Sequence, residues 1–271
     1  MAYFIVVGNE KGGTGKSTLA MNICVYLARQ GQRVGAIDLD LRQQSLARFC
    51  ENRIAYKLRE RISLPSPRFL PLPEPADQSA AAAQVDERLS RAIAPYENLL
   101  DFVVIDCPGS HTRLSQLAHS LADTLVTPIN DSFVDFDLLA HSDPVTNKLT
   151  GPSAYSEMVW NARQSREKAG LKTTDWLVVR NRMGSANMHN TQKLTQVMND
   201  LAERLNFRHV KGFSERVIFR ELFPRGLTVQ DLKDTGVTNL NVSNKAALSE
   251  VAHIMEALRL PLVLKKVDEI R

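Results

Sequence analysis

The 271-residue sequence is poor in cysteine, and the cysteines it has show no recognisable pattern. Cys24, Cys50 and Cys107 are odd in number and stand at no metal-ligand spacing. They argue against a disulfide framework and a metal cluster, including the ligand pair that an iron–sulfur redox protein would need. We expect them to be reduced and mostly buried, as in a cytoplasmic protein.

Long hydrophobic runs are also missing. No segment approaches the ~20 apolar residues that span a bilayer, so the sequence predicts no stable membrane insertion. The apolar run at residues 4–7 is short and has no basic leader, which predicts a strand and not a signal peptide. An amphipathic stripe near the C-terminus is interrupted by Pro261, and we expect it to pack against a sheet rather than a membrane. The stripe consists of Leu248, Val251, Ile254, Met255 and Leu258.

The rest of the composition is ordinary, with 44% hydrophobic and 24% charged residues. That is enough apolar material for a sizeable core. Because length sets only a soft limit on domain number, we predict one domain over residues 1–271. The net charge of +4 permits an anionic partner without requiring one.

The most informative stretch is a glycine-rich loop between an apolar run and a helical pattern. Its glycines let the chain wrap a polyphosphate without a Cβ in the way, and the following helix adds unpaired N–H groups and a positive dipole end. Lys16 can reach the β- and γ-phosphates, Ser17 can offer a hydroxyl to Mg²⁺, and Thr18 is placed for the α-phosphate. A glycine-rich turn with two solvated lysines is the alternative. The predicted nucleotide-binding residues are Lys11, Gly12, Gly13, Thr14, Gly15, Lys16, Ser17 and Thr18.

This loop differs from the ordinary phosphate-binding motif in two ways. The motif has glycine at the position of Glu10, and this chain has a second lysine, Lys11, that the motif does not require. Its K-G-G-x-G-K-[ST] pattern is complete and resembles the deviant Walker A motif of the ParA/MinD family of P-loop ATPases. That resemblance implies ATP and Mg²⁺ as cofactors and a homodimer that forms with ATP. It also implies that Lys11 crosses the dimer interface to touch the nucleotide of the partner subunit.

Two carboxylates follow the second buried strand, which we predict over residues 33–38. Because side chains alternate along a strand, Asp38 and Asp40 should point the same way, toward a nucleotide beyond its carboxyl end. A capping aspartate beside a solvated one is the alternative. The spacing is similar to the D-x-D element of the ParA/MinD family, which implies that Asp40 positions the attacking water and Asp38 belongs to the Mg²⁺ shell.

Another apolar run ends in Asp106 and resembles a Walker B strand, which would place this carboxylate at Mg²⁺ through a water. The turn at residues 107–109 could then sense the γ-phosphate. Further strands are predicted over residues 125–128 and 176–179. The resemblance makes Asn181, after the last of these, a contact to adenine, with a turn asparagine as the alternative.

A proline-rich segment interrupts these patterns between about residues 63 and 84. Its prolines exclude a central strand and a continuous helix. We interpret it as an extended surface excursion and stiff connector before a helix around residues 85–94. A proline-rich ligand for another module is the alternative.

Basic residues gather in the C-terminal half of the chain. Such a patch could hold DNA phosphates, but without a groove-reading motif or an aromatic stacking platform it would not read bases. We therefore predict non-specific DNA binding, while a solvated helix face remains the alternative for any single residue. The candidates are Lys193, Arg204, Arg208, Lys211, Arg216 and Arg220.

Three further stretches, at residues 130–137, 143–146 and 217–228, narrow the resemblance. Together with residues 8–10 and 40–43 they are similar to the MipZ family of division-site regulators. This resemblance implies an ATP-dependent dimer that binds the chromosome, is loaded by ParB and blocks FtsZ polymerisation. It also implies a cytoplasmic, nucleoid-associated protein.

The sequence thus predicts a doubly wound α/β domain with a mainly parallel sheet flanked by helices and a nucleotide site at the carboxyl ends of its strands. The predicted chemistry is slow, Mg²⁺-dependent ATP hydrolysis, in which Lys16 and the loop amides stabilise phosphoryl charge and Asp40 orients water. A ParA-type chromosome or plasmid partition ATPase would share every nucleotide residue. An ATP-dependent ligase or amidotransferase on the same scaffold is a more distant alternative, against which residues 217–228 argue.

Overall fold

The computed structural model describes residues 2–73, 82–96, 98–130, 133–142, 149–182 and 188–262. Seven strands form one sheet in the order β3-β2-β4-β1-β5-β8-β9, and all neighbouring pairs in it are parallel. The predicted α/β fold with a mainly parallel sheet is confirmed. The strands of the sheet are β1 (Tyr3–Val7), β2 (Val34–Asp38), β3 (Arg68–Phe69), β4 (Phe102–Asp106), β5 (Thr124–Asn130), β8 (Asp175–Asn181) and β9 (Arg208–Lys211). A separate antiparallel pair consists of β6 (Ala140–Ser142) and β7 (Leu149–Pro152).

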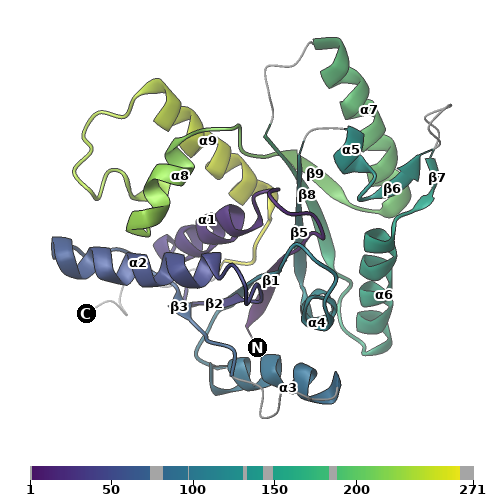
Figure 1. The fold of residues 1–271 in the computed structure, drawn as a ribbon, viewed down its shortest axis with the longest axis horizontal. Helices are drawn as coiled ribbons and strands as arrows, with labels where there is room; N and C mark the ends of the chain where they lie inside the picture. The colour runs from purple at the N-terminus through teal and green to yellow at the C-terminus, as the bar shows by residue number, and fades with distance from the viewer. Residues whose placement is uncertain are drawn as a thin grey trace.

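Helices cover both faces of the sheet (Figure 1). The helices on one face are α1 (Lys16–Arg29), α2 (Ser45–Glu60), α8 (Ile218–Leu222) and α9 (Val242–Ala257). Those on the other are α3 (Ala82–Ile93), α4 (Arg113–Leu121), α6 (Ala154–Lys168) and α7 (Met188–Leu205), while the short α5 (Phe133–Phe136) follows β5. Each face of the sheet has its own hydrophobic core. Because side chains alternate along a strand, Ile5 and Val7 of β1 lie in the first core and Val6 lies in the second. Burial on both faces explains why the strands are nearly continuous apolar runs.

Most of the predicted elements are present close to their predicted positions. The helix α1 begins at Lys16, and Gly31 follows its end with a left-handed φ of 73°. The amphipathic stripe near the C-terminus lies on α9, where Val251, Ile254 and Met255 are buried in the first core. Among the described residues, no helix is both long enough and apolar enough to cross a membrane.

The proline-rich segment differs from the predicted surface excursion in its first half. The two residues of β3 extend the sheet by pairing with Gly35 and Ala36 of β2, and the flanking Leu64 and Leu70 are buried. Proline next to this strand is tolerated because an edge strand bonds to one neighbour only. Residues 74–81, which include Pro75, lie outside the described part of the chain.

A proline also stands inside the central strand β5. Pro128 has no N–H to donate, but its neighbour β1 stays in register with β5 only as far as Val126 and then leaves the sheet. The carbonyl of Pro128 accepts a hydrogen bond from Asn9 Nδ2 at 2.5 Å. The proline therefore lies where the β1 ladder ends and the glycine-rich loop begins.

A buried ion pair fastens the chain around residue 226 to α2. Arg53 and Asp231 are almost fully buried, and two guanidinium nitrogens donate to the two carboxylate oxygens at 2.9 and 2.8 Å. Arg53 also donates to the carbonyls of Gly226 and Pro65. Gly226 has a φ of 61°, and a Cβ at this position would lie 2.0 Å from the backbone nitrogen of Arg53. Part of the 217–228 stretch is therefore a structural anchor.

We expect Arg53→Ala to lower the free energy of unfolding by ~3 kcal/mol or more, because it leaves Asp231 buried without its main partner. Arg59→Ala, which removes an exposed pair with Glu60, is the matched control and should change it by less than ~1 kcal/mol. Urea unfolding of the full chain measures both. Equal, small losses in the two variants would contradict the anchoring role.

Candidate nucleotide site

The glycine-rich loop joins β1 to α1 at the carboxyl edge of the sheet. Gly13 and Gly15 have left-handed φ values of 73° and 92°, which favour glycine. A Cβ on Gly15 would also lie 2.8 Å from Asn181 Nδ2. Gly15 is the N-cap of α1 and makes no side-chain capping bond there, so the first N–H groups of this helix remain available to an anion.

Lys16 is buried under the loop at 8% exposure. Its Nζ donates to the Lys11 carbonyl at 2.8 Å. Burial lowers the pKa of Lys16, and the negative charge of nearby Asp106 opposes this shift. The ammonium is thus held inside the loop, beside the half-buried Ser17 and Thr18, where a β- or γ-phosphate would lie in a P-loop protein.

Asp106 ends β4 with a buried carboxylate, and neither oxygen has a hydrogen-bond partner among the described residues. Burial and the neighbouring Asp38 raise its pKa to about 8, while the charge of Lys16 and the nearby hydroxyl of Ser17, which does not meet hydrogen-bond geometry with it, lower it. A buried, unsatisfied carboxylate is a strong candidate ligand for a cation. Mg²⁺ commonly takes one or two carboxylates and completes its shell with water and phosphate. Asp106 and Ser17 therefore fit the predicted Mg²⁺ site, although the described residues contain no cluster of three His, Cys, Asp or Glu side chains suited to a metal.

Asp38 lies beside Asp106, since the two are register partners in β2 and β4. Its Oδ2 accepts from the backbone N–H groups of Leu46 and Ala47 at 2.8 and 3.1 Å, and its Oδ1 accepts from that of Asp40. Asp38 thus caps α2, as in the alternative interpretation of this residue. Its place in a Mg²⁺ shell stays a prediction, supported by its proximity to Asp106.

Asp40 is the more accessible of the two carboxylates. It is half-buried, and its Oδ1 accepts from the N–H groups of Arg42 and Gln43 in a tight turn. These bonds occupy one of its two oxygens, and its role in positioning water stays a prediction.

Lys11 forms an ion pair with Asp135 of the same chain. The Asp135 side chain is buried at 3% exposure, and its Oδ2 accepts from the Asn130 N–H at 3.0 Å. The backbone N–H of Lys11 donates to Asn9 Oδ1. The sequence contains Asp135 within residues 130–137 but gives no signal for this pairing. Residues 131, 132 and 143–146 lie outside the described part of the chain.

Two contacts tie the turn after β4 to the glycine-rich loop. A Cβ on Gly109 would lie 3.1 Å from the nitrogen and 3.2 Å from the Cα of Gly12, so the two backbones are already in close approach. Glu10, the residue that departs from the ordinary motif, lies 2.6 Å from His111 Nδ1 through its Oε1. A displacement of this turn would therefore also move the glycine-rich loop.

Asn181, the last residue of β8, holds the loop from the other side. Its Nδ2 donates to the Thr14 carbonyl at 2.8 Å, and its Oδ1 accepts from the Phe213 N–H at 2.9 Å. A cavity of about 190 Å³ opens beside these contacts, between Thr18, Phe213 and Phe219. The structure brings Asn181 to the glycine-rich loop, while its contact to adenine stays a prediction. The two phenylalanines beside it carry no sequence signal that would have placed them there.

A buried chain of hydrogen bonds supports the start of the loop from below. The indole N–H of Trp176 donates to Thr127 Oγ1 at 2.9 Å, Thr127 lies 2.8 Å from the Tyr155 hydroxyl, and that hydroxyl donates to the Gly8 carbonyl at 2.8 Å. His119 packs against Gly8, where a Cβ would lie 2.5 Å from its Cε1. Burial lowers the pKa of His119 to about 4, so this ring is neutral near pH 7.

The predicted DNA-binding residues do not share one environment. Arg208 is held by both oxygens of Asp175 and by the Ala257 carbonyl, so its guanidinium serves the fold. Arg216 pairs with Glu250 at 2.8 Å and Arg220 with Glu215 at 3.2 Å, and both line the cavity beside the loop. The remaining candidates are the exposed Arg204 and Lys211, and Lys193, whose side chain lies outside the described part of α7.

We expect Asp106→Asn to stabilise the metal-free protein while weakening nucleotide-dependent Mg²⁺ binding. A folded-state pKa of about 8 against an ordinary value of 3.8 means that the folded form binds the extra proton between these pH values. Native stability should therefore fall as pH rises through this window, and the substitution should remove that slope. At pH 7.5 in EDTA we expect a gain of ~1 kcal/mol or more in the free energy of unfolding.

Urea unfolding between pH 5 and 8 measures this effect, with Glu60→Gln on the exposed end of α2 as the matched control. The same pH slope in the native protein and in Asp106→Asn would show that Asp106 is not the buried proton site.

One family description matches nearly the whole chain, and curated relatives match about half of it. The family description "ATPase MipZ" matches residues 3–262. The septum site-determining protein MinD of Bacillus subtilis is 29% identical over 143 residues, which are 46% of this chain and 52% of that protein. The chromosome-partitioning ATPase Soj of Thermus thermophilus is 30% identical over 139 residues, 48% of this chain and 55% of that protein.

Among solved structures, an ATP complex of McdA from Cyanothece superposes with a TM-score of 0.63 at 18% identity, covering 97% of this chain and 99% of that one. A likeness at this identity supports the fold. The family match covers nearly all of the chain and includes the loop, Asp106 and Asn181. The chain therefore belongs to the MipZ family of ATPases, among the ParA/MinD-type P-loop nucleotide hydrolases.

Proposed function

We propose that this chain is an ATP-dependent dimerising switch that positions the division site. Its ATP-bound dimer binds DNA non-specifically, interacts with ParB and inhibits FtsZ polymerisation, and the protein is cytoplasmic and nucleoid-associated. The observation that carries the proposal is the arrangement at the loop, where Lys16 and the unsatisfied Asp106 lie inside the site and Lys11 lies at its rim. The partner list rests on the family to which the chain belongs.

The residues of the site divide the work of ATP hydrolysis between them. The loop amides, the start of α1 and Lys16 bind the phosphates and stabilise the charge that develops on them. Asp106 and Ser17 would hold Mg²⁺, which neutralises phosphate charge when bound, and Asp38 contributes negative charge to the same corner. Asp40 orients the attacking water. The cavity next to Asn181 is placed to receive the base, with Phe213 and Phe219 as its apolar walls.

Hydrolysis is slow in this proposal because each site is incomplete in one chain. Lys11 is engaged with Asp135 and must leave this partner before it can reach the nucleotide of a second subunit. The loss of a partly buried ion pair is offset by the new contact with phosphate. ATP thus favours the dimer, and hydrolysis returns the monomer.

A ParA-type partition ATPase is the second candidate, because the relative from Thermus thermophilus is named as a chromosome-partitioning ATPase. Such a protein would use the same nucleotide residues and act on DNA cargo. Sedimentation of FtsZ polymers with this protein and ATP separates the two. A reduced polymer pellet supports the division-site function, and an unchanged one favours partition.

We expect Asp40→Ala to form a persistent dimer with ATP and Lys11→Ala to remain monomeric, because the first loses water positioning and the second loses the contact across the interface. Light scattering with ATP and magnesium measures the mass against the 30.3 kDa monomer. Lys245→Ala, an exposed lysine on α9, is the control and should match the native protein. A dimer in Lys11→Ala would reject the role of that lysine, and a native monomer with a non-hydrolysable analogue would reject the switch.

For DNA we expect the affinity of the ATP-bound Asp40→Ala dimer to fall roughly a thousandfold between 50 and 200 mM salt, the slope of about six phosphate contacts. Replacing both Lys211 and Arg220 with glutamate should flatten this slope, whereas Arg59→Glu on α2 should leave it unchanged. Fluorescence anisotropy with an arbitrary duplex measures it. Equal binding with and without ATP would remove DNA from the proposal.

A further inference from the structure

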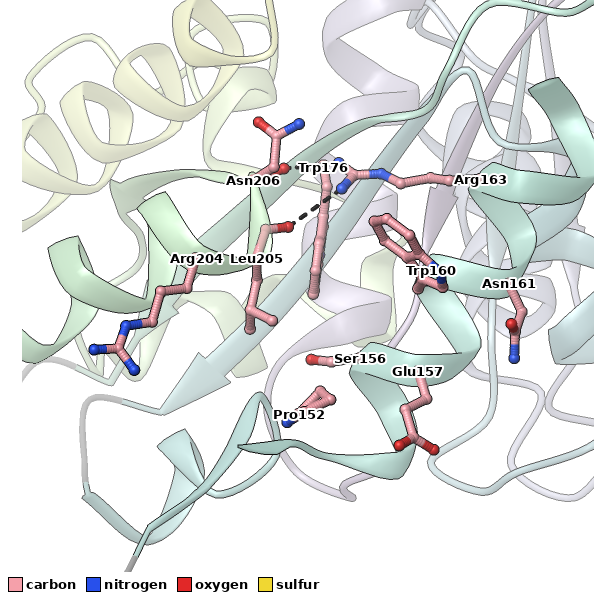
Figure 2. A pocket seen from close by; sticks show the side chains of 10 residues that line it. All are labelled: Pro152, Ser156, Glu157, Trp160, Asn161, Arg163, Trp176, Arg204, Leu205 and Asn206. Atoms are coloured by element: carbon pink, nitrogen blue, oxygen red, sulfur yellow. Dashed lines mark hydrogen bonds between the residues drawn. The ribbon is translucent and has the colours of Figure 1, made fainter. Parts of the chain in front are cut away.

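A second, larger cavity of about 410 Å³ lies away from the nucleotide site, between α6 and the end of α7 (Figure 2). Trp176 forms the floor of the cavity. It is the second residue of β8, so the cavity lies near the amino end of that strand, whereas the nucleotide site is at the carboxyl edge of the sheet. Trp160 stands on one side and Leu205 on the other, with Pro152 below. The lining contains no residue of the glycine-rich loop, and the proposed ATPase function does not account for it.

The two tryptophans give the cavity an apolar floor and an apolar rim. Trp176 is 2% exposed, whereas Trp160 is 62% exposed and is among the largest apolar side chains that the described surface presents to water. Tryptophan next to a preformed cavity is typical of the central contacts of protein interfaces. An occupant that covers Trp160 would remove this apolar surface from water.

The cavity is already shaped for an occupant. Arg163 lies over the Trp176 ring at 5.5 Å from its centroid and donates to the carbonyls of Thr174, Leu205 and Asn206. The Trp176 indole N–H is fixed by Thr127. Because these side chains are held before anything binds, an occupant pays little for ordering the walls.

The charged side chains around the cavity indicate which charge an occupant should carry. Arg204 is exposed on its rim and forms no ion pair within the described residues. Arg163 is bonded to carbonyl groups, which carry no full negative charge. Glu157 is the acidic side chain in the lining, and it lies on the α6 side in Figure 2, across from Arg204. The α7 side of the rim is therefore positive and complements a carboxylate.

We propose that this cavity docks a short peptide segment of a partner protein, which inserts a large apolar side chain between Trp160 and Leu205 and places an adjacent carboxylate on Arg204. The volume suits a single leucine or phenylalanine side chain with its flanking backbone. The partner is an acidic peptide with an apolar anchor, and its binding needs neither ATP nor a second copy of this chain.

The chain offers a direct reporter, since it contains two tryptophans and both line the cavity. Tryptophan emission of the full protein can be titrated with acetyl-Asp-Leu-Phe-Asp-amide, with its lysine counterpart acetyl-Lys-Leu-Phe-Lys-amide, and with acetyl-Asp-Ser-Ser-Asp-amide. We expect a saturable blue shift with the acidic apolar peptide at sub-millimolar to millimolar concentration. The lysine and serine peptides should bind at least about tenfold more weakly.

Arg204→Glu should weaken the acidic apolar peptide by about tenfold and strengthen the lysine peptide, while Arg59→Glu on α2 should change neither. Both substitutions are at exposed positions, so the fold should persist, and an unchanged urea midpoint checks this. Three results would overturn the proposal: no saturable shift with any peptide, equal binding of the acidic and lysine peptides, or equal losses in the two variants. The dimerisation assay is independent of this cavity, so failure here leaves the ATPase proposal standing.

Discussion

The site is built around the buried carboxylate of Asp106. This group has no contact with water and no hydrogen-bond partner among the described residues. Charge in a protein interior is costly, and burial together with the neighbouring Asp38 raises the pKa of Asp106 to about 8. This cost is confined to one corner of the site. The parallel sheet brings the ends of β1, β2 and β4 to one edge, so Lys16 and Asp38 meet Asp106 there. The glycine-rich loop closes over this corner because Gly13 and Gly15 adopt conformations that other residues rarely take. Fold and chemistry thus share one location.

Sequence reasoning succeeded where a local pattern has one physical meaning. Strands buried on both faces are continuous apolar runs, so β4 and β8 could be predicted, and the glycine and lysine spacing of the loop has few other uses. It missed β3 and β9, which are short and carry charged residues. It also missed Asp135, Phe213 and Phe219, because each reaches the site through contacts between residues far apart in the chain. No spacing encodes such contacts.

Residue type alone also failed to distinguish a charge that meets a ligand from one that meets the protein. Arg208 belongs to a basic cluster in the sequence, yet it is bonded to Asp175 and the end of α9. Asp38 has the spacing of a metal-site residue and also caps α2. Residues 217–228 narrow the resemblance to the MipZ family, yet Gly226 in this stretch is required by its close packing against Arg53. A motif can therefore mark a family through its anchors as well as through its chemistry.

The position of β1 in the middle of the sheet has a consequence for how the chain is made. Tyr3 pairs in register with Phe102, and Ile5 with Thr124, so the first strand leaves the ribosome with neither neighbour yet in existence. At translation speeds of ~5 to 20 residues per second, it waits on the order of 5 to 20 s for β4, and longer for β5. The exposed apolar strand of the nascent chain must be kept from other partners during this delay. The glycine-rich loop that follows β1 is likewise synthesised before β4 and before Asn181, which contacts it.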